Sequence, residues 1–361
     1  MSAIPTYTPP NFTVHPLVDV PAVHTAPAPA DGVLPDGFHA TSNHPEYVHL
    51  GGGRWLLARE SRMDAVLVLA GDVLDVVEPR RVRRGDRVVL GRSENGEEGI
   101  FVHTTGFGAV DDCGDKFSFR TRGTRETPFS RSYDQLYDLL RHDRMNGHIV
   151  WVLGPAVAFD RDSRDAMTYM VDHGYCHALL AGNALATHDL EAALFRTGLG
   201  QDIYSQAVRP GGHYNHLDII NLVRRHGSIA RAIHELGLHD GIIHACERGG
   251  VPYVLAGSIR DDGPLPGVIS DAYQAQDAMR EHARRATTVI ALATQLHSIA
   301  FGNMLPGYQV VEGDVVRPVY FYVVDMTEFS VDKLANRGSA QAVPILTNVQ
   351  DFMVNLRHNL E

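Results

Sequence analysis

The chain has 361 residues, 44% of them hydrophobic, and carries a formal net charge of −11 at pH 7. That length and apolar content can bury a core large enough for two domains, or for one domain with an added module. The acidic balance, with a sequence pI near 6.0, argues against nucleic acid as the main partner, because no basic stripe is available to neutralise phosphates.

The cysteines and the hydropathy of the chain indicate the cellular compartment in which we expect the protein. The three cysteines are Cys113, Cys176 and Cys246. They are far apart and form no Cys-x-x-Cys pair, so we expect neither a disulfide framework nor structural zinc, and a reducing cytoplasm fits best. The start of the chain lacks a signal-peptide pattern, and the longest apolar stretch, Thr287 to Phe301, is too short to span a bilayer. The sequence therefore predicts a cytoplasmic protein without a membrane partner.

The first third of the chain divides into two segments. Residues 1–34 are rich in proline and show no apolar periodicity, which predicts an extended arm, either disordered or laid across a neighbouring subunit. In residues 35–125 short β-type runs alternate with glycine turns, which predicts a small, mostly antiparallel β module. These runs are Tyr47–Leu50, Trp55–Ala58, Ala65–Leu69, Arg87–Leu90 and Gly99–His103.

Residues 126–361 alternate apolar strands with amphipathic helices. This βαβα order predicts an α/β domain whose parallel sheet is covered on both faces. The expected strands are His148–Leu153, His177–Ala181, Pro252–Ala256, Val319–Val324 and Ala342–Thr347. The expected helices are one that ends near Asn146, then Ser163–His173, Ala186–Phe195, a helical block Leu217–Leu236, Ser270–Arg284, Thr287–Ala300 and Val349–Asn359.

Glycines follow several of the apolar runs. Gly154, Gly182, Gly257 and Gly302 each come directly after such a run, and the last strand stops at Asp325. In open α/β sheets ligands bind outside the carboxyl ends of the strands, where glycine lets backbone N–H groups approach a phosphate and a carboxylate can bind a ribose hydroxyl. The pattern therefore predicts a dinucleotide site, although no G-x-G-x-x-G fingerprint occurs.

Three short stretches carry candidate chemistry. The loop after Ala256 brings Arg260, Asp261 and Asp262 together beside a Gly-Pro turn, which indicates a functional loop at a sheet edge. In Asn43-His44-Pro45 the turn explains Asn43 and the proline, but His44 is a candidate proton shuttle. The histidines of residues 213–216 are three apart and lack a third ligand in the sequence, so we expect a polar loop and no metal.

Several longer runs resemble the NAD-dependent ornithine cyclodeaminase family of archaea. The same unit forms the C-terminal part of the cyanobacterial arginine dihydrolase fusion, and is also described as a lysine-oxoglutarate reductase/saccharopine dehydrogenase-like conserved region. The runs are residues 37–45, Gly182–Ala186 with His188, Asp189 and Glu191, Val251–Pro266, Leu296–Ala300, Gly302–Pro306 and Asn336–Ala342. The resemblance covers roughly Asp36 to Asn359.

This resemblance implies a fold, a cofactor and a reaction. It implies a Rossmann-like C-terminal domain related to the NAD-binding fold of deoxyhypusine synthase, with NAD held by the glycine turns. It also implies that bound NAD+ takes the α-hydride of L-ornithine, that the δ-amine closes a ring with loss of ammonia, and that the returned hydride gives L-proline. Because nothing is consumed, the cofactor must be held tightly and water must be excluded.

The resemblance marks positions to which we assign roles from the chemistry. Arg260 and Asn43 are expected to bind the substrate, and Asp261, Asp262, Glu191 and His44 to act as bases or ammonium partners. Asn43 and His44 would close over the substrate from the N-terminal module. The residues expected to bind NAD are Gly154, Pro155, Ala156, Gly182, Asn183, Gly257, Ser258, Gly302, Asn303, Asp325, Gly338 and Ser339.

Two segments depart from the family's usual pattern. They are the linker 117–132, which has four arginines between Arg120 and Arg131, and the residues Met326–Phe329 after the last strand. These departures leave open a cyclodeaminase for another diamino acid, an NAD-dependent amino-acid dehydrogenase, or an NAD-binding regulator without catalysis. The proline-rich arm and the apolar run Thr287–Phe301 also suggest a subunit interface, so we expect a homo-oligomer.

Overall fold

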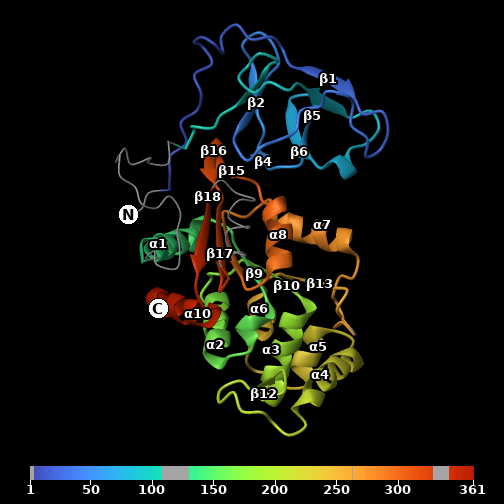
Figure 1. The fold of residues 1–361 in the computed structure, drawn as a ribbon, viewed down its shortest axis with the longest axis vertical. Coiled ribbons are helices and arrows are strands. Elements are labelled where there is room, and N and C mark those ends of the chain that lie inside the picture. Colours follow the sequence, from blue (N-terminus) through green and yellow to red (C-terminus); the bar gives the residue numbers. More distant parts are fainter. Residues whose placement is uncertain (1–3, 108–129, 262, 328–340) are drawn as a thin grey trace.

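The structure, a computed structural model, describes residues 4–107, 130–261, 263–327 and 341–361. Figure 1 shows a small β unit above a larger domain in which helices lie on both sides of a sheet. This arrangement confirms the predicted fold class, an α/β domain with a parallel sheet preceded by a small, mostly antiparallel β module.

The small β unit contains two antiparallel sheets. One has the order β1-β7-β5-β6 and the other β3-β2-β8. The strands are β1 (His24–Pro27), β2 (Glu46–His49), β3 (Trp55–Leu57), β4 (Glu60–Ser61), β5 (Val66–Ala70), β6 (Val73–Val77), β7 (Arg87–Leu90) and β8 (Ile100–Val102), with the short 3-10 helix η1 (Pro79–Arg81) before β7. Successive residues of β5 point to opposite faces, so that Leu67 joins one apolar cluster while Val66 and Val68 join another.

Of residues 4–34, expected as an arm, Ile4 packs against the core of the larger domain and the rest run along the small β unit of their own chain. β1 pairs with β7, with His24 opposite Leu90. Phe12 stacks on Trp55 with ring centroids 4.4 Å apart. The lack of periodicity in this segment reflects its attachment through a few separate contacts rather than through one continuous apolar face.

The larger domain begins with α1 (Ser130–Asn146) and continues as strands and helices in alternation. Its strands are β9 (Ile149–Leu153), β10 (Ala178–Gly182), β11 (Thr197–Gly198), β12 (Gln201–Asp202), β13 (Tyr253–Ala256), β14 (Thr288–Leu292), β15 (Tyr308–Val311), β16 (Val315–Pro318), β17 (Tyr320–Asp325) and β18 (Gln341–Leu346). Its helices are η2 (Pro155–Ala158), α2 (Arg161–Asp172), α3 (Asn183–Phe195), α4 (Gly212–His226), α5 (Ile229–Glu235), α6 (Ile242–Gly249), α7 (Ala272–Ala283), α8 (Gln295–Met304), η3 (Glu312–Asp314) and α10 (Val349–Leu360).

The central sheet is parallel throughout and has the order β13-β10-β9-β14-β17-β18. Side chains alternate across it. Trp151 points to the core shared with Met167 of α2 and Phe352 of α10, whereas Val152 points to the core shared with Met279 of α7. Accordingly, α7 and α8 lie on one side of the sheet and α1, α2 and α10 on the other (Figure 1).

The expected helix Thr287–Ala300 is wrong. Its first half is strand β14, buried at every position, and α8 begins only at Gln295. A short apolar run has no periodicity that separates a buried strand from a buried helix, and the β-branched residues of Thr287–Ile290 favour the strand. Gly302 consequently lies inside α8 rather than at the carboxyl edge of the sheet, and the chain leaves β14 at Ala293 instead.

A third small sheet, β16-β15-β4, joins the two parts of the molecule. Gln309 of β15 lies opposite Glu60 of β4, and the Tyr308 hydroxyl donates to the carbonyl of Ala58 over 2.6 Å. The small β unit is therefore attached beside the start of β17, and α3 and α4 lie at the far end of the sheet (Figure 1).

Candidate active site

The strand order places a crevice between β9 and β14. Numbered along the chain, the six parallel strands are arranged 3-2-1-4-5-6, and the direction of winding reverses between β9 and β14. Ligands of such sheets bind at this switch point, outside the carboxyl ends of the strands. A pocket of about 870 Å³ opens there. It is lined by residues 153–155, 159, 182–185, 188, 199, 213, 216, 217, 220, 221, 224, 258, 260, 261, 263, 294 and 297.

Two glycines set the shape of the crevice. A Cβ built on Gly154 would collide with the carbonyl oxygen of Ala293, because the ends of β9 and β14 approach closely there. A Cβ on Gly182 would lie 2.8 Å from Cε1 of His297. The Gly154 position therefore needs a residue without a side chain, whereas a side chain at Gly182 would require the His297 ring to move.

The first turn of α3 offers hydrogen-bond donors to the pocket. Residues 183–185 line the pocket, and the residue before the helix, Gly182, has no side chain with which to cap their N–H groups. The same holds for α8, where Thr294 lines the pocket and makes no capping hydrogen bond with its side chain in the described structure. Free N–H groups and the helix dipole together favour an anion at these ends.

The predicted substrate loop is tied to α3. The backbone N–H of Leu265 donates to Oδ1 of Asn183 over 2.9 Å. Asp261 uses Oδ2 to accept from the N–H of Ser258, and Nε of Arg224 donates to the carbonyl of Pro264. Burial lowers the pKa of His297, on the opposite wall, and Asp261 partly offsets that shift.

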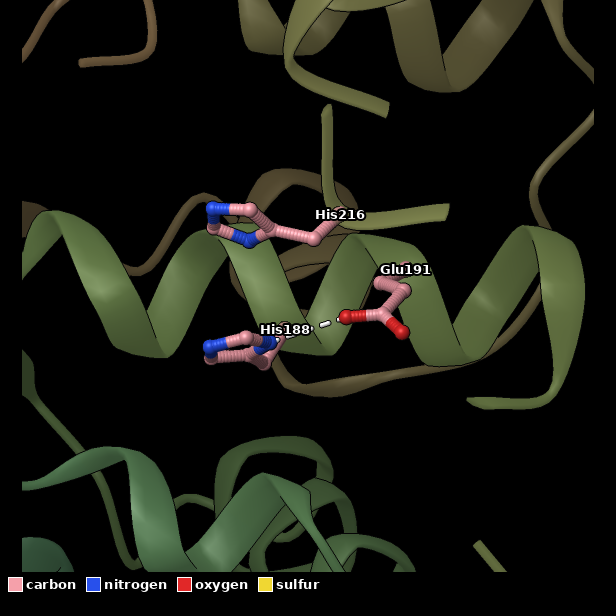
Figure 2. Close-up of side chains that lie close together, drawn as sticks. All are labelled: His188, Glu191 and His216. Atoms are coloured by element: carbon pink, nitrogen blue, oxygen red, sulfur yellow. Dashed lines mark hydrogen bonds and ion pairs between the residues drawn. The ribbon is translucent and has the colours of Figure 1, made fainter. Parts of the chain in front are cut away.

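A buried hydrogen-bonded chain runs behind the pocket wall. His188 Nδ1 and Glu191 Oε2, both on α3, are 2.9 Å apart (Figure 2). Thr197 donates its hydroxyl to Glu191 Oε1 over 2.8 Å, and Asn215 donates in turn to Thr197. Glu191 is fully buried, whereas His188 lines the pocket.

His216 of α4 lies over this pair, with its ring 5.2 Å from that of His188 (Figure 2). One ligand atom from each of His188, Glu191 and His216 lies within 4.8 Å of the others. No third ligand lies near His213 and His216 in the sequence, but the fold brings His188 and Glu191 of α3 close to His216. The described contact is a hydrogen bond between His188 and Glu191, and an ion would have to replace the proton that they share.

The structure brings together some of the predicted site residues. Those that line the pocket are Gly154, Pro155, Gly182, Asn183, Ser258, Arg260 and Asp261. Glu191 lies behind the wall, and Gly257 packs against Ser270. Ala156 accepts from Gln350 through its carbonyl. Asp262, Gly338 and Ser339 lie outside the described residues.

Other predicted residues lie apart from the pocket. Gly302 and Asn303 are near the far end of α8, where the carbonyl of Asn303 accepts from Arg62. Asn43 packs against Gly307, just beyond that end, and α8 of ten residues is about 15 Å long. Asp325 accepts from Thr327 two residues later. Among the described residues, neither Asn43 nor His44 lines the pocket.

Several polar residues that line the pocket were not predicted as site residues. They include His188, His216, Arg224, Thr294 and His297. The spacing of His188 and Glu191, three apart on a predicted helix, was a usable signal, since such residues share a helix face. Thr294 was hidden by the wrong helix, and Arg224 comes from a long helical insertion whose position the local pattern does not determine.

No helix in the described parts of the chain combines the length and the apolar character needed to cross a membrane.

Comparisons with known proteins identify relatives over nearly the whole chain. The family model for the C-terminal Rossmann fold of arginine dihydrolase ArgZ-like proteins matches residues 135–356. Ornithine cyclodeaminase of Methanopyrus kandleri is 40% identical over 350 residues, which cover 94% of this chain and 78% of that protein. The bifunctional arginine dihydrolase/ornithine cyclodeaminase AgrE of a Nostoc species is 33% identical, over 93% of this chain and 46% of that protein.

Solved structures agree with these matches. A conserved LOR/SDH protein from Methanococcus maripaludis superposes with a TM-score of 0.85 at 36% identity, over 94% of this chain and 98% of that chain. The ternary complex of AgrE with ornithine and NAD+ superposes with a TM-score of 0.60 at 31% identity, over 96% of this chain and 47% of that chain.

Proposed function

The chain belongs to the ornithine cyclodeaminase family, and we propose that it is an enzyme that converts L-ornithine to L-proline and ammonia with NAD as its cofactor. The observation that carries the proposal is the pocket at the switch point of the sheet. It combines helix amino-termini suited to a dinucleotide with charged groups suited to a diamino acid.

NAD fits this pocket on the chemistry of its lining. The N–H groups in the first turns of α3 and α8 are donors for a pyrophosphate, and the Gly154 turn lies between them at the crevice. We propose that residues 154–155, 182–185 and 294 hold the cofactor. When bound, NAD supplies a group that accepts a hydride from carbon and returns it. The apolar residues Leu153, Phe159 and Ile220 line the same pocket and would limit the access of water.

Ornithine offers one carboxylate and two ammonium groups, and the pocket holds partners for the carboxylate and for one ammonium group. Arg224 and Arg260 line it as guanidinium groups for the carboxylate, and Asp261 as a carboxylate for an ammonium group. Because Arg224 is already bonded to the carbonyl of Pro264, substrate binding to Arg224 would act on the same loop that carries Arg260 and Asp261.

Turnover with substoichiometric NAD+ tests the proposal. The purified chain is incubated with L-ornithine and a small amount of NAD+, and ammonia, proline and NADH are measured. We expect ammonia and proline in equal amounts, in excess of the cofactor, with no net NADH. Accumulation of NADH with an oxidised amino-acid product would instead indicate a dehydrogenase, and the absence of turnover on ornithine would contradict the proposal.

A further inference from the structure

The proposed reaction needs a group that moves protons. An amine donates its electron pair to a developing imine only after it has lost its ammonium proton, and the nitrogen that departs as ammonia must gain one. Our inference rests on the proposed function and concerns which side chain does this. Glu191, predicted as a base, is fully buried, and both of its oxygens already accept hydrogen bonds, so it does not reach the substrate.

His188 combines access to the pocket with a buried carboxylate partner. The side chain is 6% exposed and lines the pocket, between the first turn of α3 and Phe159, whose ring meets it edge-on at 5.0 Å. Nδ1 bonds to Glu191, and Figure 2 shows Nε2 directed away from that carboxylate. His188 thus joins a pocket-lining position to a hydrogen bond with a buried carboxylate.

The hydrogen bonds of Glu191 determine the tautomer and the orientation of the His188 imidazole. Because Glu191 accepts, the proton on the neutral ring is held at Nδ1, and Nε2 is left with its lone pair. Thr197 donates to the other oxygen of the carboxylate, and Asn215 donates to Thr197 and holds it in place, so Glu191 cannot turn away from this arrangement without breaking the bond from Thr197. This is the geometry of a base oriented by a buried acid.

We propose that His188 is the catalytic proton-transfer residue of this enzyme and that Glu191 is its positioning residue. Nε2 takes a proton from a substrate ammonium group, so that an N–H bond of the substrate breaks and an N–H bond of the ring forms. The charge of the resulting imidazolium is balanced by Glu191. The proton is returned to the α-nitrogen as that nitrogen leaves as ammonia, and His188 ends in its starting state.

The test compares His188→Ala and His188→Asn with the wild-type chain. A positioned acid–base group contributes about 10²- to 10⁴-fold to the rate, so we expect kcat to fall by about that factor while the Kd for NAD+ changes little. Imidazole added to His188→Ala should restore part of the rate. His188→Asn keeps an amide that can donate to Glu191 but cannot carry a proton, so it should fold and remain inactive.

Glu191→Gln tests the positioning role. We expect a lower kcat with an unchanged KM for ornithine, and a double variant with His188→Ala no slower than His188→Ala alone. His226→Ala is the matched control, because His226 makes the same kind of contact with Glu235, 2.7 Å away, outside the pocket lining. It should keep the wild-type rate.

The outcomes separate this inference from the proposed function. If the wild-type chain makes no proline from ornithine, the proposed function fails. If it does, and the two His188 variants turn over at the wild-type rate, only the present inference is overturned. A stoichiometric metal ion in the wild-type chain that is lost from His188→Ala would also overturn it, because His188 would then be a ligand rather than a proton carrier.

Discussion

A single side chain, Asn183, links the two halves of the proposed site. It is the first residue of α3, where the N–H groups face the pocket, and its Oδ1 accepts the hydrogen bond from Leu265 in the substrate loop. Asn183 is only 6% exposed, and its hydrogen bond with Leu265 is buried. The cofactor end and the substrate loop can therefore be perturbed separately by two substitutions at one position.

We expect Asn183→Ala to weaken the binding of ornithine and Asn183→Asp to weaken the binding of NAD+. Alanine leaves the N–H of Leu265 without its acceptor at a cost of about 1–3 kcal/mol, which should loosen the loop and raise the KM for ornithine. Aspartate keeps the acceptor but adds a negative charge at the proposed pyrophosphate site, which should weaken NAD+ binding. Titration of NAD+ and ornithine with each variant measures both. The same profile for both variants would show that Asn183 does not separate the two functions.

Strand ends could be read from the sequence, but the reach of side chains could not. Gly154, Gly182 and Asn183 line the pocket because a glycine after an apolar run marks the carboxyl edge of a parallel sheet. Glu191 was predicted as a base from its residue type, but its carboxylate is buried in the protein. His188, three residues earlier on the same helix, lines the pocket instead. Which of two neighbouring polar groups reaches the pocket depends on the packing of α4 and of residues 197–200, which local patterns do not contain.

At the scale of elements, α1, β14 and β16 are joined by one buried carboxylate. Asp143 of α1 is fully buried and accepts from Arg317 of β16 and from the hydroxyls of Thr287 and Thr288. Burial raises the pKa of Asp143, but Arg317 and the hydrogen-bond donors outweigh burial, so the pKa lies below its ordinary value. The carboxylate is therefore charged in the folded protein at neutral pH.

Asp143→Asn should destabilise the fold strongly. The substitution leaves Arg317, 5% exposed, as a buried charge without its counter-ion, which costs about 3–5 kcal/mol. Asp138→Asn on the same helix is the control, because the carboxylate of Asp138 is 50% exposed and its pair with Arg141 is worth little. Urea denaturation measures both free energies of unfolding. Equal stability of the two variants would contradict this role for Asp143.

A cluster of histidines at the start of the sheet predicts a pH effect. Burial, with Arg285, His177 and His282 nearby, lowers the pKa of His148 from 6.5 to about 4. Between these values the unfolded chain binds more protons than the folded one, so stability rises with pH across that window and falls on acidification. The melting temperature of His148→Asn should change less between pH 4 and 6.5 than that of the wild type. His234→Asn, exposed on α5, should retain the wild-type slope, and an unchanged slope in His148→Asn would refute the effect.

The alternation of strands and helices was predictable from the sequence. The segment 287–300, predicted as one helix, shows where this kind of prediction fails. Strands β9, β10, β13 and β17 follow from apolar runs bounded by turns, but residues 287–300 join a buried strand to a helix without an intervening polar stretch. Over that length neither periodicity nor composition marks the junction. The error displaced the expected strand end from Ala293 to Gly302 and so removed Thr294 from the predicted site.

At the scale of the whole molecule, the small β unit contacts the larger domain on the side where strand β17 of the parallel sheet begins. Glu78, 7% exposed, pairs with Arg280 of α7 and, at 3.0 Å, with Arg62. Arg62 also donates to the carbonyl of Asn303 across 241 positions of sequence. Contacts over such separations are not visible in local patterns, and the substrate-closing role assigned to Asn43 and His44 stays a prediction. The homo-oligomer expected from the proline-rich segment stays a prediction.

The central claim is that one pocket of this chain converts ornithine to proline and returns the hydride that it removes. The most direct measurement uses L-ornithine with deuterium on the α-carbon, unlabelled NAD+ below stoichiometry, and mass spectrometry of the product. We expect proline that retains the deuterium on its α-carbon, with one ammonia released per proline and no net NADH. Proline without deuterium, or deuterium found in accumulated reduced cofactor, would contradict it.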